Sequence, residues 1–253
     1  MSAKILLWDI ETAANLGYVW QKYQQDVIAY EQEWYMLCYS YKWLGDKKTH
    51  VVSLPDFSGY ARNKTDDKKL ITSLWGVLDS ADICIGHNSS RFDHPKANSR
   101  FIYHGLPPHS PVKKIDTLQI ARRQFKFNCN RLDSLGETLG LGRKVKHSGF
   151  DLWRKCMSGD MAAWKEMVKY AKGDVDLLEK VYLKLRPYSD DNVHVGLFEE
   201  NPLTKCPCCG SVNLVRRGYQ VASTRTYRQF VCKDCGRWCR SVLSEKDKKA
   251  DIR

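Results

Sequence analysis

The N-terminal stretch Ile5-Leu6-Leu7-Trp8-Asp9-Ile10-Glu11-Thr12 begins as a continuous apolar run and ends at two carboxylates. A short apolar run of this kind is typical of a buried strand, and we expect a strand over residues 3–10. Alternate residues of a strand share a face, so Asp9 and Glu11 should project together while Ile10 packs into the opposite layer. Two neighbouring buried carboxylates repel each other, and a divalent cation relieves that repulsion because hard cations prefer oxygen ligands. The alternative is a solvated strand end with two unrelated acids.

Beyond this strand, the hydrophobic pattern predicts two more strands, followed by alternating helices and strands. Strands joined by short turns are antiparallel, and strands reached through helices are parallel. We therefore predict an α/β fold in which a mixed sheet, antiparallel and then parallel, is flanked by helices. The expected elements are strands 34–44 and 49–54, helix 65–79, strand 81–86, helix 93–103, strand 114–116, a helix from Thr117, helix 131–139 and helix 161–185.

Two later segments carry further carboxylates. The strand 81–86 runs into a polar loop that ends at Asp93, where a helix begins. Tyr170 and Asp174 are four residues apart on a helix, so a phenol and a carboxylate lie on one helical face. Each segment has a plain structural interpretation, because Asp is a favoured helix N-cap and a surface helix commonly carries Tyr and Asp.

The order of these three segments resembles the DnaQ-like exonuclease superfamily, also called the DEDD nucleases. The first motif of that family resembles Asp9-Ile10-Glu11-Thr12, and the second resembles residues 88–93, where Phe92 precedes the acid. The third resembles Tyr170-x-x-x-Asp174, which indicates the tyrosine subclass (DEDDy). The histidine subclass would have His at position 169, which is Lys in this chain. The resemblance covers residues 4–185.

The resemblance implies a ribonuclease H-like fold and a 3′→5′ exonuclease that holds two Mg²⁺ or Mn²⁺ ions. Such an enzyme would release nucleoside 5′-monophosphates from single-stranded or frayed DNA. Asp9 would bridge the two ions, Glu11 and Asp174 would complete the ion that activates water, and Asp93 would support the second ion. Tyr170 would orient the attacking water. The expected nucleic-acid contacts near this site are Thr12, Asn88 and Phe92, the last as stacking surface or core.

Six of the 10 cysteines fall between positions 206 and 239. Two C-x-x-C-Gly segments resemble the two knuckles of a zinc ribbon with a tetrahedral Cys₄ site. A domain this small would take much of its folding energy from the metal, and the residues between the knuckles suit a small hairpin. A redox pair is the alternative. The expected Zn²⁺ ligands are Cys206, Cys209, Cys232 and Cys235, although Cys208 or Cys239 could replace one of them.

The C-terminal region is the more basic part of the chain per residue. Residues 201–253 contain 12 Lys and Arg against 4 Asp and Glu, interleaved with Tyr219, Tyr227, Phe230 and Trp238. Basic residues bind phosphates, and aromatic rings stack on unpaired bases. A solvated scaffold or a protein-docking ribbon is the alternative. The predicted nucleic-acid contacts in this region are Arg216, Arg217, Arg225, Arg228 and Arg237.

Charge and composition favour a nucleic-acid partner for the whole chain. The net charge of +12 and the pI of about 9.2 favour polyanions. No apolar stretch is long enough to span a membrane, and the run at residues 5–8 is too short for a signal peptide. We therefore expect a cytoplasmic protein (host cytoplasm if viral) without a membrane partner. DNA is favoured over RNA, and replication or repair proteins are further candidate partners.

These patterns predict four segments: an exonuclease domain over 1–188, a linker over 189–202, a zinc ribbon over 203–242 and a charged tail over 243–253. The aromatic segment 18–23 follows the first motif and is a candidate for stacking on terminal bases, whereas the aromatics of 34–43 suit strand packing. Three functions compete with the DNA exonuclease: the same activity on RNA, a catalytically silent nucleic-acid-binding adaptor, and a structure-specific endonuclease.

Overall fold

The computed structural model describes residues 3–23, 26–190, 193–198 and 204–249, without the side chains of 246–249. The chain divides into two compact units. We call residues 4–122 and 126–181 the central unit, and residues 1–3, 123–125 and 182–253 the C-terminal unit. No helix in the described ranges is long and apolar enough to cross a membrane.

The central unit is built on a mixed five-stranded sheet in the order β5-β4-β1-β6-β7. Strand β1 lies in the middle, antiparallel to β4 and parallel to β6. β5 pairs antiparallel with β4, and β7 pairs parallel with β6. The predicted mixed α/β fold is therefore confirmed. The strands are β1 (Ile5–Thr12), β4 (Met36–Trp43), β5 (His50–Ser53), β6 (Ile83–Gly86) and β7 (Lys113–Asp116).

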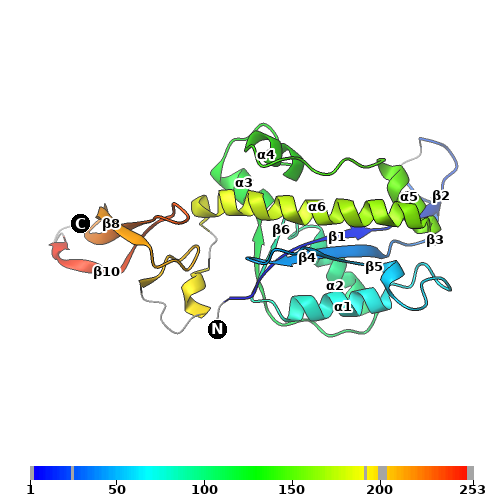
Figure 1. Cartoon of the computed structure of the whole chain (residues 1–253), viewed down its shortest axis with the longest axis horizontal. Coiled ribbons are helices and arrows are strands. Elements are labelled where there is room, and N and C mark those ends of the chain that lie inside the picture. The colour runs from blue at the N-terminus through cyan, green and yellow to red at the C-terminus, as the bar shows by residue number, and fades with distance from the viewer. Residues whose placement is uncertain (1–2, 24–25, 191–192, 199–203, 250–253) are drawn as a thin grey trace. The chain divides into compact units, whose positions relative to one another are not determined.

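Helices cover both faces of this sheet (Figure 1). α1 (Lys68–Asp79) and α2 (Asp93–Tyr103) lie on one face, and the long helix α6 (Met161–Leu185) lies along the other. Lys42 on β4 fastens α6 to the sheet, because its Nζ donates to Oε2 of Glu179 at 2.6 Å. The remaining helices are α3 (Thr117–Gln124), α4 (Leu132–Thr138) and α5 (Phe150–Ser158).

The alternation of β1 separates the core from the acidic residues. Leu6, Trp8 and Ile10 belong to the buried cluster that contains Leu70 and Leu74 of α1. Because the period of a strand is two, Asp9 and Glu11 project from the other face, toward α6. The apolar positions of β1 therefore fix the direction in which its two acids point.

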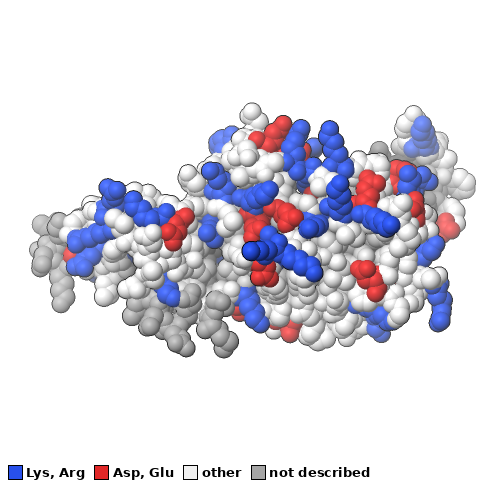
Figure 2. Space-filling view, viewed as in Figure 1, with Lys and Arg blue, Asp and Glu red and all other residues white. Residues whose placement is uncertain are grey.

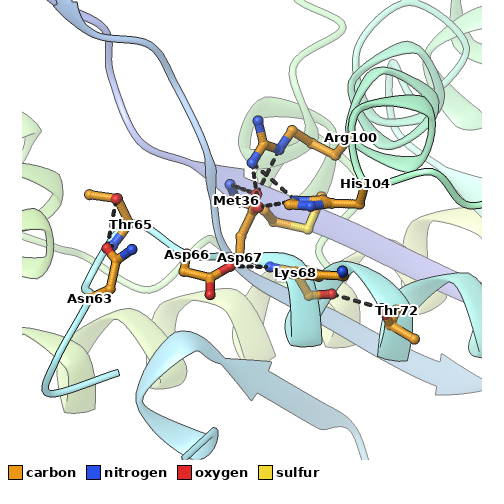
Figure 3. Close-up of polar contacts among 9 residues, drawn as sticks. All are labelled: Met36, Asn63, Thr65, Asp66, Asp67, Lys68, Thr72, Arg100 and His104. Carbon is orange, nitrogen blue, oxygen red and sulfur yellow. Dashed lines mark hydrogen bonds and ion pairs between the residues drawn. The ribbon is translucent and has the colours of Figure 1, made fainter. Parts of the chain in front are cut away.

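A buried carboxylate, Asp67, links three elements of the central unit (Figure 3). Its side chain accepts hydrogen bonds from the backbone N of Met36 at 2.8 Å and from Nε of Arg100 at 2.8 Å. Nη2 of Arg100 also contacts it, and Nε2 of His104 lies 2.6 Å away. Asp67 has no exposed surface, so it joins the start of α1 to α2 and β4 as an internal polar anchor.

The sequence pattern missed two strands and one α-helix of the central unit. β2 (Leu16–Tyr18) and β3 (Ala29–Gln32) form a short antiparallel hairpin whose residues are mostly exposed, so no alternation of apolar and polar residues indicates it. α5 buries only Leu152 and Cys156, which is a weak helical signal. The predicted helices 93–103 and 161–185 match α2 and α6 residue for residue.

The C-terminal unit contains a three-stranded antiparallel sheet in the order β10-β9-β8. The bounds are β8 (Leu214–Val221), β9 (Arg225–Cys232) and β10 (Trp238–Lys249). The sheet adds a third strand to the expected hairpin, and β10 continues across position 242 into the segment expected to be a tail. Short 3₁₀ turns lie at η2 (Arg186–Tyr188) and η3 (Val195–Phe198), the second within the expected linker.

Candidate metal centres

Three carboxylates of the central unit converge. Asp9 and Glu11 from β1 and Asp174 from α6 each place an oxygen within 4.8 Å of the others. This is the set expected from the first and third motifs, and it forms because β1 aims both acids at α6 while Asp174 faces the sheet from the middle of that helix.

The mutual repulsion of these acids changes their titration. Burial, followed by the charge of Asp174, raises the pKa of Asp9 from 3.8 to about 7. Burial and then Asp9 raise the pKa of Glu11 well above its ordinary value. Burial also raises the pKa of Asp174, while Lys144 opposes that rise. The cluster therefore favours either protons or a cation.

Lys144 is a site residue that the sequence did not reveal. It lies in the loop between α4 and α5, and its Nζ lies 2.5 Å from Oδ2 of Asp174 and 3.3 Å from the hydroxyl of Tyr170. Its own backbone N donates to Oδ1 of Asp133 at 2.8 Å, which fixes the loop. Burial lowers the pKa of Lys144, but Asp174 and the other acids outweigh burial and raise it. The only feature of the sequence that could have pointed to Lys144 is the basic segment 143–146.

Tyr170 lies beside Asp174, as the i and i+4 spacing predicts. Its ring packs edge-on against His147, with ring centres 4.7 Å apart, and against Trp153 at 5.8 Å. Burial and the charge of Asp174 raise the pKa of its phenol, so Tyr170 stays protonated and acts as a hydrogen-bond donor at neutral pH.

Asp93, the first residue of α2, takes a different position. Its Oδ1 accepts a hydrogen bond from the backbone N of Ile10 at 3.1 Å, so it is attached to β1 between the two motif-one acids. Burial and then Asp9 raise its pKa well above the ordinary value. Asp93 nevertheless lies outside the set of three carboxylates within 4.8 Å.

The loop before Asp93 is held by Asp116. This carboxylate accepts hydrogen bonds from the backbone N of Asn88 at 2.9 Å and of Ser90 at 3.2 Å. It also caps α3, because it accepts a hydrogen bond from the backbone N of Leu118 at 3.0 Å. Asn88 has a φ of 65°, a conformation that Asn tolerates better than most residues. The loop before Asp93 is therefore fixed in one conformation by these hydrogen bonds.

An open hollow of about 570 Å³ lies beside the acidic cluster. Asn88 and Lys144 line it together with Arg122, Asn130, Arg131 and Asp133. Thr12 ends β1 and is partly buried. Phe92 is 39% exposed, and Nζ of Lys96 lies 5.3 Å from the centre of its ring. Phe92 thus presents ring surface to solvent instead of being enclosed in the core.

The C-terminal unit brings four cysteines together. The thiols of Cys206 and Cys235 are 3.7 Å apart, and those of Cys209 and Cys232 are 3.6 Å apart. All four sulfur atoms lie within 4.8 Å of one another, and Cys208 and Cys239 are outside this set. Although burial opposes it, backbone hydrogen bonds from Cys235 and Asp234 lower the pKa of Cys232 to about 7.

Residues 36–186 match the model of the family RNase_H_2, described as the RNase_H superfamily. The match covers more than half of the 253 residues. The chain belongs to the RNase_H superfamily. A search of curated proteins gives no match.

Among solved structures, this RNase_H superfamily member is similar to the family B DNA polymerase from the hyperthermophilic archaeon Pyrobaculum calidifontis. The TM-score is 0.56 and the sequence identity is 15%. The similarity covers 89% of this chain and 32% of the polymerase, so the chain spans about a third of that protein's length. At this identity the similarity establishes the fold.

RNase H-like nucleases use divalent metal ions, and the acidic residues of this superfamily member fit one. Asp9, Glu11 and Asp174 supply the hard oxygen ligands that Mg²⁺ and Mn²⁺ prefer. Oδ1 of Asp174 is buried and has no hydrogen-bond partner among the described residues, as expected of an oxygen reserved for a cation. The four thiols in the C-terminal unit fit Zn²⁺ equally well, because Cys₄ is a standard structural set for zinc.

The predicted arginine contacts of the C-terminal unit have different surroundings. Arg217 and Arg225 are exposed. Nη2 of Arg216 donates to the hydroxyl of Tyr219 at 2.6 Å, and Arg228 pairs with Glu245 at 2.6 Å. Nη1 of Arg237 donates to the carbonyls of Pro187 and Ser189 at 2.8 and 2.7 Å.

Proposed function

We propose that this protein is a DEDDy-type 3′→5′ exonuclease that hydrolyses single-stranded or frayed DNA with two divalent ions. The observation that carries the proposal is the convergence of Asp9, Glu11 and Asp174, with the Tyr170 phenol beside Asp174. Membership in the RNase_H superfamily supports a hydrolase of nucleic acid.

The residues of the site divide the chemistry between them. Asp9, Glu11 and Asp174 would hold one ion, and Asp93 with Asp9 would support the second. The ions supply charge neutralisation at the phosphate and a lowered pKa for the attacking water. Tyr170 donates a hydrogen bond that orients this water, and its raised pKa excludes it as the base. Cleavage of the last phosphodiester bond on its 3′-oxygen side releases a nucleoside 5′-monophosphate.

Lys144 positions two of these groups. Its ammonium holds Asp174 and Tyr170 in one arrangement through two hydrogen bonds. The bond to Asp174 is charge-assisted on both sides, and such bonds are among the stronger ones in proteins. We therefore assign Lys144 a positioning role in the hydrolysis.

The hollow next to the acids supports a nucleic-acid strand as substrate. Besides Lys144, which is paired with Asp174, the lining carries Arg122 and Arg131 against one acid, Asp133, and such a lining attracts phosphates. Thr12, Asn88 and Phe92 are proposed contacts for the 3′-terminal nucleotides. The structural similarity to a DNA polymerase favours DNA over RNA as the substrate.

The C-terminal residues complete the proposal. We propose a Zn²⁺ ion on Cys206, Cys209, Cys232 and Cys235, within a ribbon that follows an exonuclease domain over 1–188. We also propose a cytoplasmic setting in which replication or repair proteins are partners.

The deciding experiment follows a 5′-labelled single-stranded DNA in Mg²⁺ or Mn²⁺, with Asp174→Asn as the inactive variant. Asp176→Asn is the matched control, because Asp176 contacts Thr49 and Lys42 instead of the acidic cluster. We expect a ladder that shortens from the 3′ end. Asp174→Asn should reduce the rate by roughly 10²- to 10³-fold or more, and Asp176→Asn by less than about threefold.

Other outcomes identify the competing functions. Internal cuts would indicate a structure-specific endonuclease, and cleavage of RNA alone would reassign the substrate. DNA and RNA that stay intact as single strands and as duplexes would reject the enzyme and leave a nucleic-acid-binding adaptor.

A further inference from the structure

The register of the C-terminal sheet assigns its side chains to two faces. Directly paired residues of neighbouring strands lie on one face, and residues two apart along a strand share it. Val215 pairs with Val231, which pairs with Trp238. Gln229 pairs with Arg240, and Gln220 pairs with Tyr227. These residues form one surface, which we call the Trp238 face: Val215, Gln220, Tyr227, Gln229, Val231, Trp238 and Arg240.

The opposite face is engaged within the unit. Leu214 and Cys232 pair there and pack at the cysteine cluster. Arg228 on that face pairs with Glu245, and Arg216 contacts Tyr219. The aromatic and basic residues of the paired strands are therefore divided between the two faces, and those of the Trp238 face project from the side of the sheet opposite Cys232.

The chemistry of the Trp238 face suits unpaired bases. Trp238 is 52% exposed, and the guanidinium of Arg240 lies over the ring of Tyr227 at 3.9 Å from its centre. Planar aromatic and guanidinium groups stack on bases, and Arg neutralises phosphates. The described sheet positions of this face include no Asp or Glu, although Asp190 lines a hollow beside Trp238. On the side of the C-terminal unit that faces the viewer in Figure 2, Lys and Arg predominate and a few acidic residues lie among them.

The spacing of the two rings indicates an oligonucleotide. Tyr227 lies four residues from Val231, the partner of Trp238. At about 3.3 Å per residue this places the two rings roughly 13 Å apart along the strand, so they cannot enclose one base. Trp238 and the stacked pair of Arg240 and Tyr227 would each take a different base of the same strand.

We propose that the Trp238 face is a stacking platform for unpaired bases and is separate from the acidic site. It would give the chain a second binding site for single-stranded nucleic acid. This inference rests on the proposed function, because that function identifies nucleic acid as the partner. Two linked weak sites raise the overall affinity above that of either alone.

The test measures binding of a fluorescein-labelled oligothymidylate to the full chain at fixed salt by fluorescence anisotropy, in an Asp174→Asn background that prevents cleavage. Trp238→Ala should weaken binding by roughly 5- to 150-fold, the range for loss of one stacked base. Val221→Ala, an exposed residue on the opposite face, is the control and should change Kd by less than about twofold. Trp238→Phe should restore most of the affinity.

A strand with abasic sites separates stacking from charge, because it keeps the phosphates and lacks the bases. The chain with Trp238 should bind this strand more weakly than oligothymidylate, and the Trp238→Ala chain should discriminate less between the two. The proposal would be overturned if the two chains bound oligothymidylate with equal affinity. It would also be overturned if the chain with Trp238 bound oligothymidylate and the abasic strand with equal affinity. Zinc content is measured for each variant, and Tyr227→Leu repeats the test if Trp238→Ala loses zinc.

A dinucleotide substrate distinguishes this proposal from the proposed function. A dinucleotide bound for cleavage is taken up by the acidic site and leaves no further base for the platform, so Trp238→Ala with Asp174 intact should cleave it at the wild-type rate. Loss of cleavage with retained Trp238-dependent binding would reject the nuclease alone, and the reverse pattern would reject the platform alone.

Discussion

Nζ of Lys144 lies 2.5 Å from Oδ2 of Asp174, so a lysine from a loop supplies positive charge to a cluster of acids from a strand and a helix. The Lys144 side chain is only 31% exposed and that of Asp174 only 2%. The central unit therefore carries its own cation at the edge of a site that fits divalent ions.

Replacing Lys144 with Met should lower kcat/KM by roughly 10- to 150-fold, because a hydrogen bond to a charged group contributes about 1.5–3 kcal/mol. Lys146→Met is the matched control, since Lys146 is exposed in the same loop. Single-turnover cleavage of a labelled strand measures both variants. Wild-type rates for Lys144→Met would show that Lys144 does not position Asp174 and Tyr170.

The affinity for Mn²⁺ should rise with pH between 5.5 and 8. The pKa of Asp9 is raised to about 7, so below that pH a metal must displace a proton from it. Isothermal titration between pH 5.5 and 8, in two buffers with different ionisation enthalpies, measures the affinity and the protons released. An affinity that is flat across this range would contradict the prediction.

The same shift affects the stability of the metal-free protein. Because the pKa of Asp9 is higher in the folded than in the unfolded state, the folded state binds more protons between about pH 4 and 7. The free energy of unfolding without metal should therefore fall as pH rises through this window. Asp9→Asn should reduce that slope in urea denaturation with chelator-treated protein, and an unchanged slope would assign the effect to other groups.

Cys232→Ser should abolish zinc binding, whereas Cys208→Ser should keep one Zn²⁺ per chain. The thiol of Cys232 lies 3.6 Å from that of Cys209 within the four-sulfur set, and Cys208 lies outside it. A structural zinc site supplies much of the folding free energy of a small domain. Metal analysis and limited proteolysis of the C-terminal unit measure the two effects, and loss of zinc from Cys208→Ser would revise the ligand set.

Asp67→Asn should destabilise the protein by about 3–5 kcal/mol, because it leaves Arg100 and His104 without their buried partner (Figure 3). Asp66→Asn next to it is the control, since Asp66 is exposed and should change the free energy of unfolding by about 0.5 kcal/mol or less. Urea denaturation with zinc present measures both. Equal stabilities would show that the charge of Asp67 is dispensable.

The parts of the site that follow from local periodicity could be predicted from the sequence. The alternation of β1 placed Asp9 and Glu11 on one face, and the helical spacing placed Asp174 one turn after Tyr170. The two pairs of cysteine ligands could also be predicted, because the spacing within each C-x-x-C segment is a local property. Each of these depends on residues within a few positions of one another.

The missed features depend on contacts between distant segments. Lys144 reaches Asp174 across 30 positions, and Asp67 reaches Arg100 across 33, so no pattern within one segment reveals either pair. The hairpin β2–β3 was missed for another reason. Its strands have three and four residues and are mostly exposed, and the strand signal depends on burial of one face.

The pairing of β1 with β4 on one side and β6 on the other limits how this protein can evolve. Deleting or inserting one residue within β1 would exchange its faces, turning Trp8 toward α6 and the acids into the apolar layer. Length changes in this strand should therefore disrupt the sheet and the acidic cluster. They should be tolerated among the exposed residues 19–23 and 26–28 between β2 and β3, so new specificities are expected to evolve there while the acidic cluster stays fixed.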